Sequence, residues 1–437
     1  MSNLRPFQIV LLGVFIAFAV GGLILFSVYR GFGTDPNPYG ARVVIWGTLD
    51  ERPFREAINT LSDADDNFKI VSYVRKNEST FENELVNAIA EGRGPDAVVI
   101  SNELLISVRA KLYPISYDAL PERTIKDTYV DGAEIFSLSD GTYGLPFAVD
   151  PLVMYWNRDL FATAGLATPP ATWEALVAST VPALTHRATD STFVFTQEAL
   201  AFGEYANVTH ASDVMMMLLL QAGSPLITEY VNGYAAALNQ AVGQTARPPL
   251  DAALDFYTQF ANPSRTTYTW NRSLPQDRAA FLAGDLALYF APGSESSSLR
   301  AGNPNLNFDA AQIPQGSSVT VKKGFGTFYA LSILTSGKNI QGTYQALSVL
   351  GADAEAGALA SGLGFAPVHR DVLAAGTANP FQQTTYRAAL IARGFLNPNP
   401  AGSEGVIKTM IEDVTSGRER ISEAARDAVG RFNLLLQ

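Results

Sequence analysis

The chain has 437 residues, a length that predicts two domains rather than one. Hydrophobic residues make up 47% and charged residues 17%, which fits a folded body and argues against a largely disordered chain. The formal net charge of −11 argues against nucleic acid as a partner, because phosphate binding needs a basic surface. With no cysteine and only three widely separated histidines, we expect no disulfide, no metal site and no cofactor.

An uncharged apolar run near the N-terminus covers residues 7–29 (FQIVLLGVFIAFAVGGLILFSVY). At about 1.5 Å per residue it is long enough to cross a hydrocarbon core of about 30 Å. It ends without the small residues of a cleavage site, which favours an uncleaved signal anchor over a cleaved signal peptide. Arg5 and Arg30 stand on either side, so flanking charge does not set the orientation. We expect residues 1–6 in the cytoplasm, one transmembrane helix over 7–29 in the lipid bilayer, and a linker over 30–40.

Strand and helix patterns alternate from residue 41. Short apolar runs at 42–46, 68–74 and 95–101 are typical of buried strands, and stretches 51–63 and 80–92 between them have apolar residues at helical spacing. This order predicts an α/β fold with a parallel, doubly wound sheet, in which ligands bind at the carboxyl ends of the strands. The residues expected at that crevice are Trp46, Asp50, Ser101, Asn102 and Glu103.

The middle of the chain has a different pattern, with helical stretches and Pro and Gly loops as far as about Ala291. Residues 308–314 and 326–334 then have the pattern of strands, and residues 339–352 that of a helix. Sheet-like sequence thus returns late in the chain. This predicts two lobes joined by several crossings.

The segment 140–176 (DGTYGLPFAVDPLVMYWNRDLFATAGLATPPATWEAL) resembles the family 1 extracellular solute-binding proteins, which include the maltose-binding protein. The resemblance rests on the motifs G-x-x-Y-G-x-P, Y-N-x-D-L-F and P-x-T-W-E-x-L, which occur in the family's order. Shorter matches such as GPDAVVIS, LLLQAGSPLI, DRAAFLAGDLALYFAPGS and SGRERISEAARDAV extend it over roughly residues 41–435. It implies a two-lobe periplasmic-binding-protein-like fold with a hinge, and delivery of a bound solute to the permease subunits of an ABC importer.

The resemblance also places the lobes and the protein. Lobe one would comprise residues 41–147 and 316–365, and lobe two residues 150–309 and 366–437. The hinge would lie near residues 146–151, 310–315 and 365–367. We expect a monomeric body on the extracytoplasmic side of the cell membrane.

Aromatic side chains are the first candidates for the solute site, because a sugar presents apolar CH faces to flat rings. Trp46 closes the first strand. Tyr155 and Trp156 are neighbours on a strand, so one should face the cleft and the other the core, and the resemblance favours Trp156 for the cleft. Trp270 stands in a polar loop, TYTWNRSLPQD, where an exposed Trp without a ligand would be unfavourable. Phe325 is a candidate from the returning strand, although most aromatic residues there should be core.

Polar candidates come from two places. Those expected at cleft edges are Asp50, Asn102, Glu103 and Asp150. Carboxylates accept strong hydrogen bonds from sugar hydroxyls, and Asp150 matches an acidic hinge position of the family. Gly293 and Ser294 lie in a loop whose backbone N–H groups either bind a hydroxyl or an anion, or simply begin a helix.

Two other classes of protein remain open. A glycosidase would use two carboxylates about 5–10 Å apart, and a chain with 42 acidic residues always offers such a pair. However, the sequence has no nucleophile elbow, H-E-x-x-H, P-loop or dinucleotide motif, so we expect no enzyme. A surface receptor or adhesion module with the same fold is the second alternative. We predict a binding protein for a small solute, a sugar or oligosaccharide.

Overall fold

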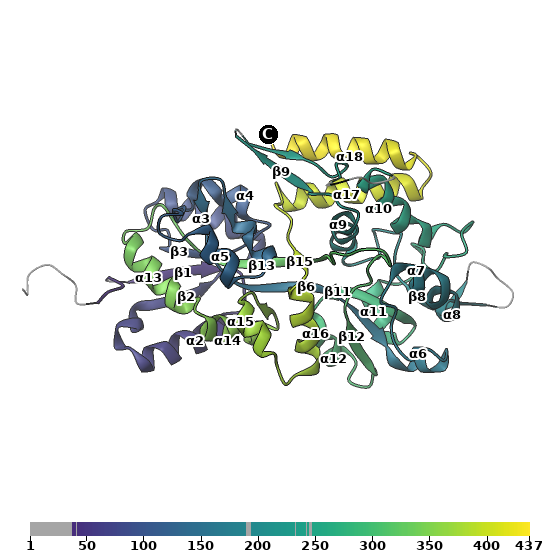
Figure 1. Ribbon diagram of the computed structural model, residues 1–437, viewed down its shortest axis with the longest axis horizontal. Coiled ribbons are helices and arrows are strands. Elements are labelled where there is room, and N and C mark those ends of the chain that lie inside the picture. Colours follow the sequence, from purple (N-terminus) through teal and green to yellow (C-terminus); the bar gives the residue numbers. More distant parts are fainter. Residues whose placement is uncertain (1–36, 41, 189–193, 232, 242, 244–246) are drawn as a thin grey trace, which may run out of the picture.

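The computed structural model describes residues 37–437 except 41, 189–193, 232, 242 and 244–246. Figure 1 shows two α/β lobes side by side, joined by a sheet that runs through both. Within the described residues, no helix is both long enough and apolar enough to cross a membrane. The predicted cytoplasmic N-terminus and membrane anchor (residues 1–29), with linker residues 30–36, lie outside the described residues.

Lobe one is built on the parallel strands β1 (Val43–Gly47), β2 (Val71–Arg75) and β3 (Ala97–Ser101), in the order β2-β1-β3. Helices α2 (Glu51–Ala64) and α3 (Phe81–Ala90) connect them, which confirms the predicted β-α-β-α-β unit. The second strand begins at Val71 rather than at residue 68. The reason is a short 3-10 helix (Asp66–Ile70), which Asp65 caps by accepting a hydrogen bond from the backbone N–H of Asn67.

Both faces of this sheet are buried, because alternate side chains along a strand point to opposite faces. Ile45 and Val99 pack with Phe54 of α2 on one face, whereas Val98 packs with Phe81 of α3 on the other. The remaining elements of lobe one are α4 (Leu105–Val108), α5 (Glu122–Thr128), β4 (Ser137–Leu138), β5 (Gly141–Thr142), α13 (Ile340–Leu350), α14 (Asp353–Leu363), β14 (Ala366–Pro367) and α15 (Arg370–Ala375).

Lobe two combines a second half-sheet with a larger set of helices. Its strands are β7 (His186–Arg187), β8 (Phe195–Leu200), β11 (Leu286–Pro292) and β12 (Phe308–Ala311), with a separate hairpin of β9 (Ile227–Tyr230) and β10 (Gly233–Ala236). Its helices are α6 (Arg158–Thr163), α7 (Trp173–Ala175), α8 (Val181–Leu184), α9 (Ala211–Gln221), α10 (Pro249–Thr258), α11 (Asp277–Ala283), α12 (Glu295–Gly302), α17 (Pro400–Thr415) and α18 (Ile421–Leu435).

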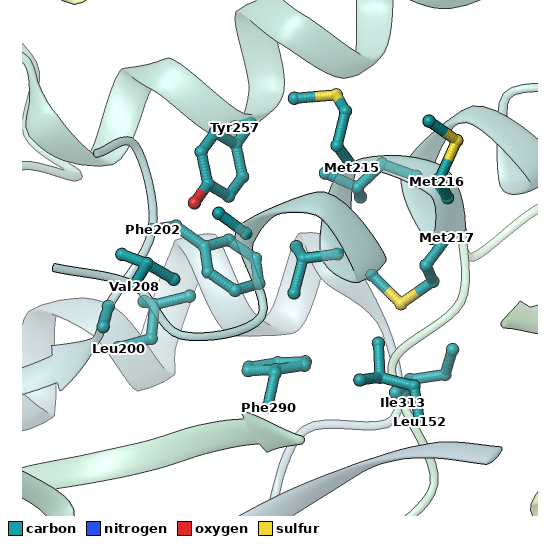
Figure 2. Close-up of a cluster of buried hydrophobic side chains, with 14 of the residues drawn as sticks. Leu152, Leu200, Phe202, Val208, Met215, Met216, Met217, Tyr257, Phe290 and Ile313 are labelled. Carbon is teal, nitrogen blue, oxygen red and sulfur yellow. The ribbon is translucent and has the colours of Figure 1, made fainter. Parts of the chain in front are cut away.

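Helix α9 lies in the core of lobe two. Figure 2 shows Met215, Met216 and Met217 projecting from it, with Tyr257 of α10 above Phe202 and with β11 below. A helix without a polar face is expected only where protein surrounds it. The polar residues of α9 stand at its ends, and those of its first turn are directed to lobe one, as described below.

Two long strands, β6 (Leu145–Asn157) and β13 (Gly324–Ile333), cross between the lobes. β6 pairs antiparallel with β13 on the lobe-one side and with β11 on the lobe-two side. All of β6 is buried except Trp156, as expected for a strand at the centre of the molecule. The predicted hinge segment 146–151 lies in the first half of this strand.

The second predicted hinge segment, residues 310–315, lies in lobe two. Ala310 and Ala311 belong to β12 and pair with the end of β6 in lobe two. Gln315 stays in the same lobe, since its backbone N–H donates a hydrogen bond of 3.1 Å to the carbonyl of Ala171. The second crossing therefore falls on β13 itself.

Beyond the third predicted hinge segment, residues 365–367, the chain still contacts lobe one. Helix α15 packs on lobe one, where Arg370 makes an ion pair of 2.6 Å with Asp131. Helix α16 (Pro380–Ala389) lies beside β6, and β15 (Ala392–Arg393) pairs with the start of β13. The chain returns fully to lobe two only after β15. Contacts between residues far apart in the sequence set both boundaries, and the local pattern does not contain them.

Candidate functional site

A cavity of about 700 Å³ lies between the lobes. One wall comes from the carboxyl ends of β1 and β3 and from α3, the edge at which parallel strands form a crevice. The other wall comes from the first turns of α9 and α17. Lobe one and β13 contribute Thr48, Leu49, Glu78, Ser79, Phe81, Glu82, Val99, Ser101, Glu103, Leu104, Phe325, Thr327 and Tyr329. Lobe two contributes Ser212, Asp213, Met216, Phe395, Asn397, Asn399, Pro400, Ala401, Ser403, Glu404 and Ile407.

Four aromatic residues give the cavity its apolar part. They are Phe81, Phe325, Tyr329 and Phe395. Phe81, Phe325 and Phe395 are almost fully buried. Tyr329 is held by Phe365, whose ring stacks on it with centroids 5.0 Å apart and an interplanar angle of 6°. None of the four tryptophans, all of which the structure describes, lines this cavity.

Five carboxylates face the same cavity. They are Glu78, Glu82, Glu103, Asp213 and Glu404, and no Lys, Arg or His stands among the described lining residues. Burial raises the pKa of Glu103 to about 7, and the negative charges of Asp213, Glu404 and Glu78 add to this effect. The described titratable side chains that line the cavity are thus all acidic, apart from the Tyr329 phenol.

His210 partly compensates one of these carboxylates. Its Nδ1 lies 3.1 Å from Asp213 and its Nε2 lies 2.6 Å from Glu295. Burial alone would lower the pKa of His210, but hydrogen bonds to the two carboxylates and their charges raise it to about 10. The imidazolium therefore connects the cavity wall to the start of α12. Arg278, 3.3 Å from Glu295, also balances that carboxylate.

Asp150 lies beside this network, in the middle of β6. Its carboxylate accepts hydrogen bonds from the backbone N–H of Ser294 at 3.1 Å and from its hydroxyl at 2.5 Å. Burial raises the pKa of Asp150 to about 7, although these two hydrogen bonds act in the opposite direction. Asp150 and Ser294 thus fasten α12 to the crossing strand, and neither lines the cavity.

Asn102 links β3 to β13, the second strand that crosses between the lobes. Its side-chain carbonyl accepts from the backbone N–H of Phe328 at 2.7 Å, and its amide donates to the carbonyl of Phe395 at 2.6 Å. The fully buried Asn102 therefore ties the end of β3 to β13 and to the chain that returns to lobe two. It does not line the cavity, contrary to the prediction from its place after a strand.

The hairpin β9–β10 joins the lobes away from the crossing strands, and Figure 1 shows it extending from lobe two over lobe one. Arg109 of lobe one donates a hydrogen bond of 2.6 Å to the hydroxyl of Tyr234 and lies 3.6 Å from Glu229. The Ser139 hydroxyl donates to Glu229 at 3.1 Å. These contacts hold the two walls of the cavity together.

Of the eleven residues predicted for the site, Glu103 and Phe325 line the cavity. Asp50 instead caps α2, accepting from the backbone N–H of Arg52 at 3.1 Å. Trp46 packs on the lobe-one core beneath Lys76, whose ammonium nitrogen lies 3.8 Å from the ring centroid. Gly293 is buried, and its backbone N–H donates to the carbonyl of Pro151.

The other aromatic candidates lie in lobe two, away from the cavity. Tyr155 is core, and its hydroxyl donates to the carbonyls of Pro292 and Gly293. Trp156 points to the opposite face, as the strand period requires, but that face packs on Phe161 rather than on the cleft. Trp270 is fully buried, with its indole N–H 3.1 Å from Asn207. Its polar loop is covered by the rest of the lobe, so no ligand is needed to shield the ring.

The lobe-two wall of the cavity was not predicted from the sequence. Asp213 lies in the first turn of α9, and Glu404 lies in the first turns of α17, which Asn399 caps by accepting from the backbone N–H of Gly402 at 2.7 Å. The sequence N-P-N-P-A-G-S-E at residues 397–404 has a turn followed by polar residues at the start of a helix. This pattern predicts the helix, but it does not indicate that the start of the helix faces lobe one.

A family model described as bacterial extracellular solute-binding protein matches residues 56–385. A putative binding protein of Brucella abortus (strain 2308) is 29% identical over 132 residues, which cover 29% of this chain and 31% of that protein. The match thus spans less than a third of the length of that curated relative.

Solved structures are similar over most of the chain. A cyclo/maltodextrin-binding protein complexed with maltotetraose has a TM-score of 0.72 and 16% identity, covering 92% of this chain and 97% of that one. A cyclic α-maltosyl-1,6-maltose binding protein from Arthrobacter globiformis has a TM-score of 0.72 and 18% identity, covering 90% and 98%. At these identities the likeness shows the fold. The chain belongs to the bacterial extracellular solute-binding protein family, a family of binding proteins rather than enzymes.

Three carboxyl groups with raised pKa values make the stability of the protein depend on pH. Burial raises the pKa of Asp150, Glu198 and Glu103 to about 7. Between about pH 4 and 7 the folded protein holds protons that the unfolded chain has released, so stability falls as pH rises through this window. Each group that is fully protonated in the fold and fully ionised when unfolded changes the free energy of unfolding by about 1.4 kcal/mol per pH unit.

We therefore expect a higher thermal unfolding midpoint near pH 5.5 than near pH 7.5. Burial lowers the pKa of His369, so below the ordinary pKa of histidine this group makes stability rise with pH. It is one group against three. Glu198→Gln should make the unfolding midpoint depend less on pH, because it removes one of the three groups with a raised pKa. It should leave the cavity undisturbed, since Glu198 lies in the core of lobe two away from it. A midpoint that rises from pH 5.5 to 7.5 would contradict these assignments.

Proposed function

We propose that this protein captures a saccharide in the cavity between its lobes and delivers it to an ABC importer. In this proposal the body is extracytoplasmic and monomeric, and the apolar segment 7–29 anchors it in the membrane. The proposal combines the family with the chemistry of the cavity. Its carrying observation is an interlobe cavity of about 700 Å³ that offers both aromatic rings and hydrogen-bonding groups.

The size and lining of the cavity suit a sugar. Pockets of about 300–1,000 Å³ hold molecules of drug size, and a saccharide of two or three rings falls in that range. The partly buried Tyr329 offers a ring surface to CH groups, whereas Ser101 and Thr327, which are also partly buried, offer hydrogen bonds to hydroxyls. Several of the similar structures are complexes with a saccharide, for example maltotetraose in a cyclo/maltodextrin-binding protein and acarbose in the GacH receptor of Streptomyces glaucescens.

The arrangement of the walls supports capture by closure. Glu103 and Phe81 belong to lobe one, and Asp213 and Glu404 belong to lobe two, so a solute between them touches both lobes. A ligand that contacts both walls binds the closed form better than the open form and shifts the population toward it.

A thermal-shift screen of the protein without its first 36 residues tests the proposal. The panel contains mono-, di- and trisaccharides, polyols and amino acids. A saccharide present at about 100 times its Kd should add about 2.7 kcal/mol to the stability and raise the midpoint by several degrees. Shifts produced only by amino acids or polyols, or by no compound, would contradict the saccharide assignment.

A further inference from the structure

We propose that the saccharide carries a positive charge, as an amino sugar or a basic glycoside does, and that the carboxylates of the cavity select it over neutral sugars. This rests on the proposed function, because the site is the same interlobe cavity. The cavity and its aromatic lining define the site, and the carboxylates define the charge of its occupant.

The carboxylates come from separate elements of both lobes. Glu78 stands before α3 and Glu82 stands within it, Glu103 follows β3, and Asp213 and Glu404 lie on α9 and α17. Only Asp213 has a cationic partner, His210, among the ion pairs of the described residues, and His210 is shared with Glu295. Four of the five negative charges therefore lack a fixed cation in the described part of the chain.

A neutral sugar would not require this arrangement. Its hydroxyls both donate and accept hydrogen bonds, so a site for it is satisfied by amides, hydroxyls and an occasional carboxylate. Here the lobe-two carboxylates Asp213 and Glu404 come toward Glu78 and Glu103 of lobe one when the lobes approach. Like charges then oppose closure of the empty protein.

A cationic solute reverses that effect. An ammonium group between the walls converts the repulsion into attraction toward both lobes, so it favours the closed form specifically. Glu103 is the best placed partner, since it is half-buried and no described side chain gives it a hydrogen bond or an ion pair. The groups that face it are Glu78, Asp213 and Glu404, all acidic.

Matched sugar pairs test the inference. Glucosamine disaccharides and trisaccharides are compared with their N-acetylated forms and with maltose and maltotriose, by isothermal titration calorimetry near pH 7.5. We expect the amine form to bind at least about tenfold more tightly than its N-acetylated form. This preference should shrink at high salt, since screening weakens charge interactions.

Variants localise the effect. Glu103→Gln and Glu404→Gln should each weaken binding of the amine form about tenfold more than binding of the neutral sugars. Glu56→Gln, on the exposed face of α2, is the matched control and should change neither. Neutral sugars that bind as tightly as the amine form, with no effect of Glu103→Gln, would overturn this inference and leave the proposed function standing. Failure of every sugar to bind would overturn both.

Discussion

Asn102→Ala should lower the free energy of unfolding by about 2–4 kcal/mol. The substitution leaves the backbone N–H of Phe328 and the carbonyl of Phe395 buried without partners. An unsatisfied buried polar group costs about 1–3 kcal/mol, and the small cavity left by the missing amide adds to it. Urea unfolding followed by circular dichroism measures the change.

The matched control for this variant is Asn83→Ala, on the exposed face of α3. Its effect should be within about 0.5 kcal/mol, as for most surface substitutions. A loss below 1 kcal/mol for Asn102→Ala would show that the three chain segments do not depend on this side chain. The assignment of Asn102 as a clamp between crossings would then be wrong.

Thr48→Trp should weaken saccharide binding by about 100-fold or more. Thr48 follows β1, lines the cavity and is only partly buried, so an indole there projects into the space where a sugar ring would stack. A 100-fold loss corresponds to about 2.7 kcal/mol, the order expected when a bound ring must be displaced or tilted. Calorimetry with the saccharide that gives the largest thermal shift measures it.

Two controls separate blockage of the cavity from damage to the fold. Thr60→Trp, on the exposed side of α2, should leave the affinity unchanged. The unfolding midpoint of Thr48→Trp should stay close to that of the natural sequence, because its side chain makes no contact that holds the sheet together. Unchanged affinity in a well-folded Thr48→Trp would place the saccharide outside this cavity.

Local pattern was enough to predict the first half of lobe one. The apolar runs at β1 and β3 and the helical spacing of α2 and α3 fix a parallel sheet, and its carboxyl edge forms one wall of the cavity. Glu103 was found in this way, because it is the second residue after a strand. Asn102 stands at the same edge, but its side chain turns inward to two backbone groups more than 200 residues away.

The rest of the site could not be predicted because it depends on contacts between distant segments. The loop around Trp270 is polar in sequence, yet Asn207 from another loop accepts its indole N–H and the lobe encloses it. Strand alternation correctly predicts that Tyr155 and Trp156 point to opposite faces of the sheet. It does not indicate which of these faces meets the other lobe. The boundary at α15 follows from the pair Arg370 and Asp131, which are 239 residues apart.

Hydrogen–deuterium exchange of the body with and without saturating saccharide tests most directly whether the solute is held between the lobes. The account predicts slower exchange on both walls, in residues 78–82 and 101–104 of lobe one and in residues 212–216 and 399–407 of lobe two. The exposed part of α2 should exchange as before. Protection confined to one lobe, or located away from these four segments, would contradict capture in the interlobe cavity.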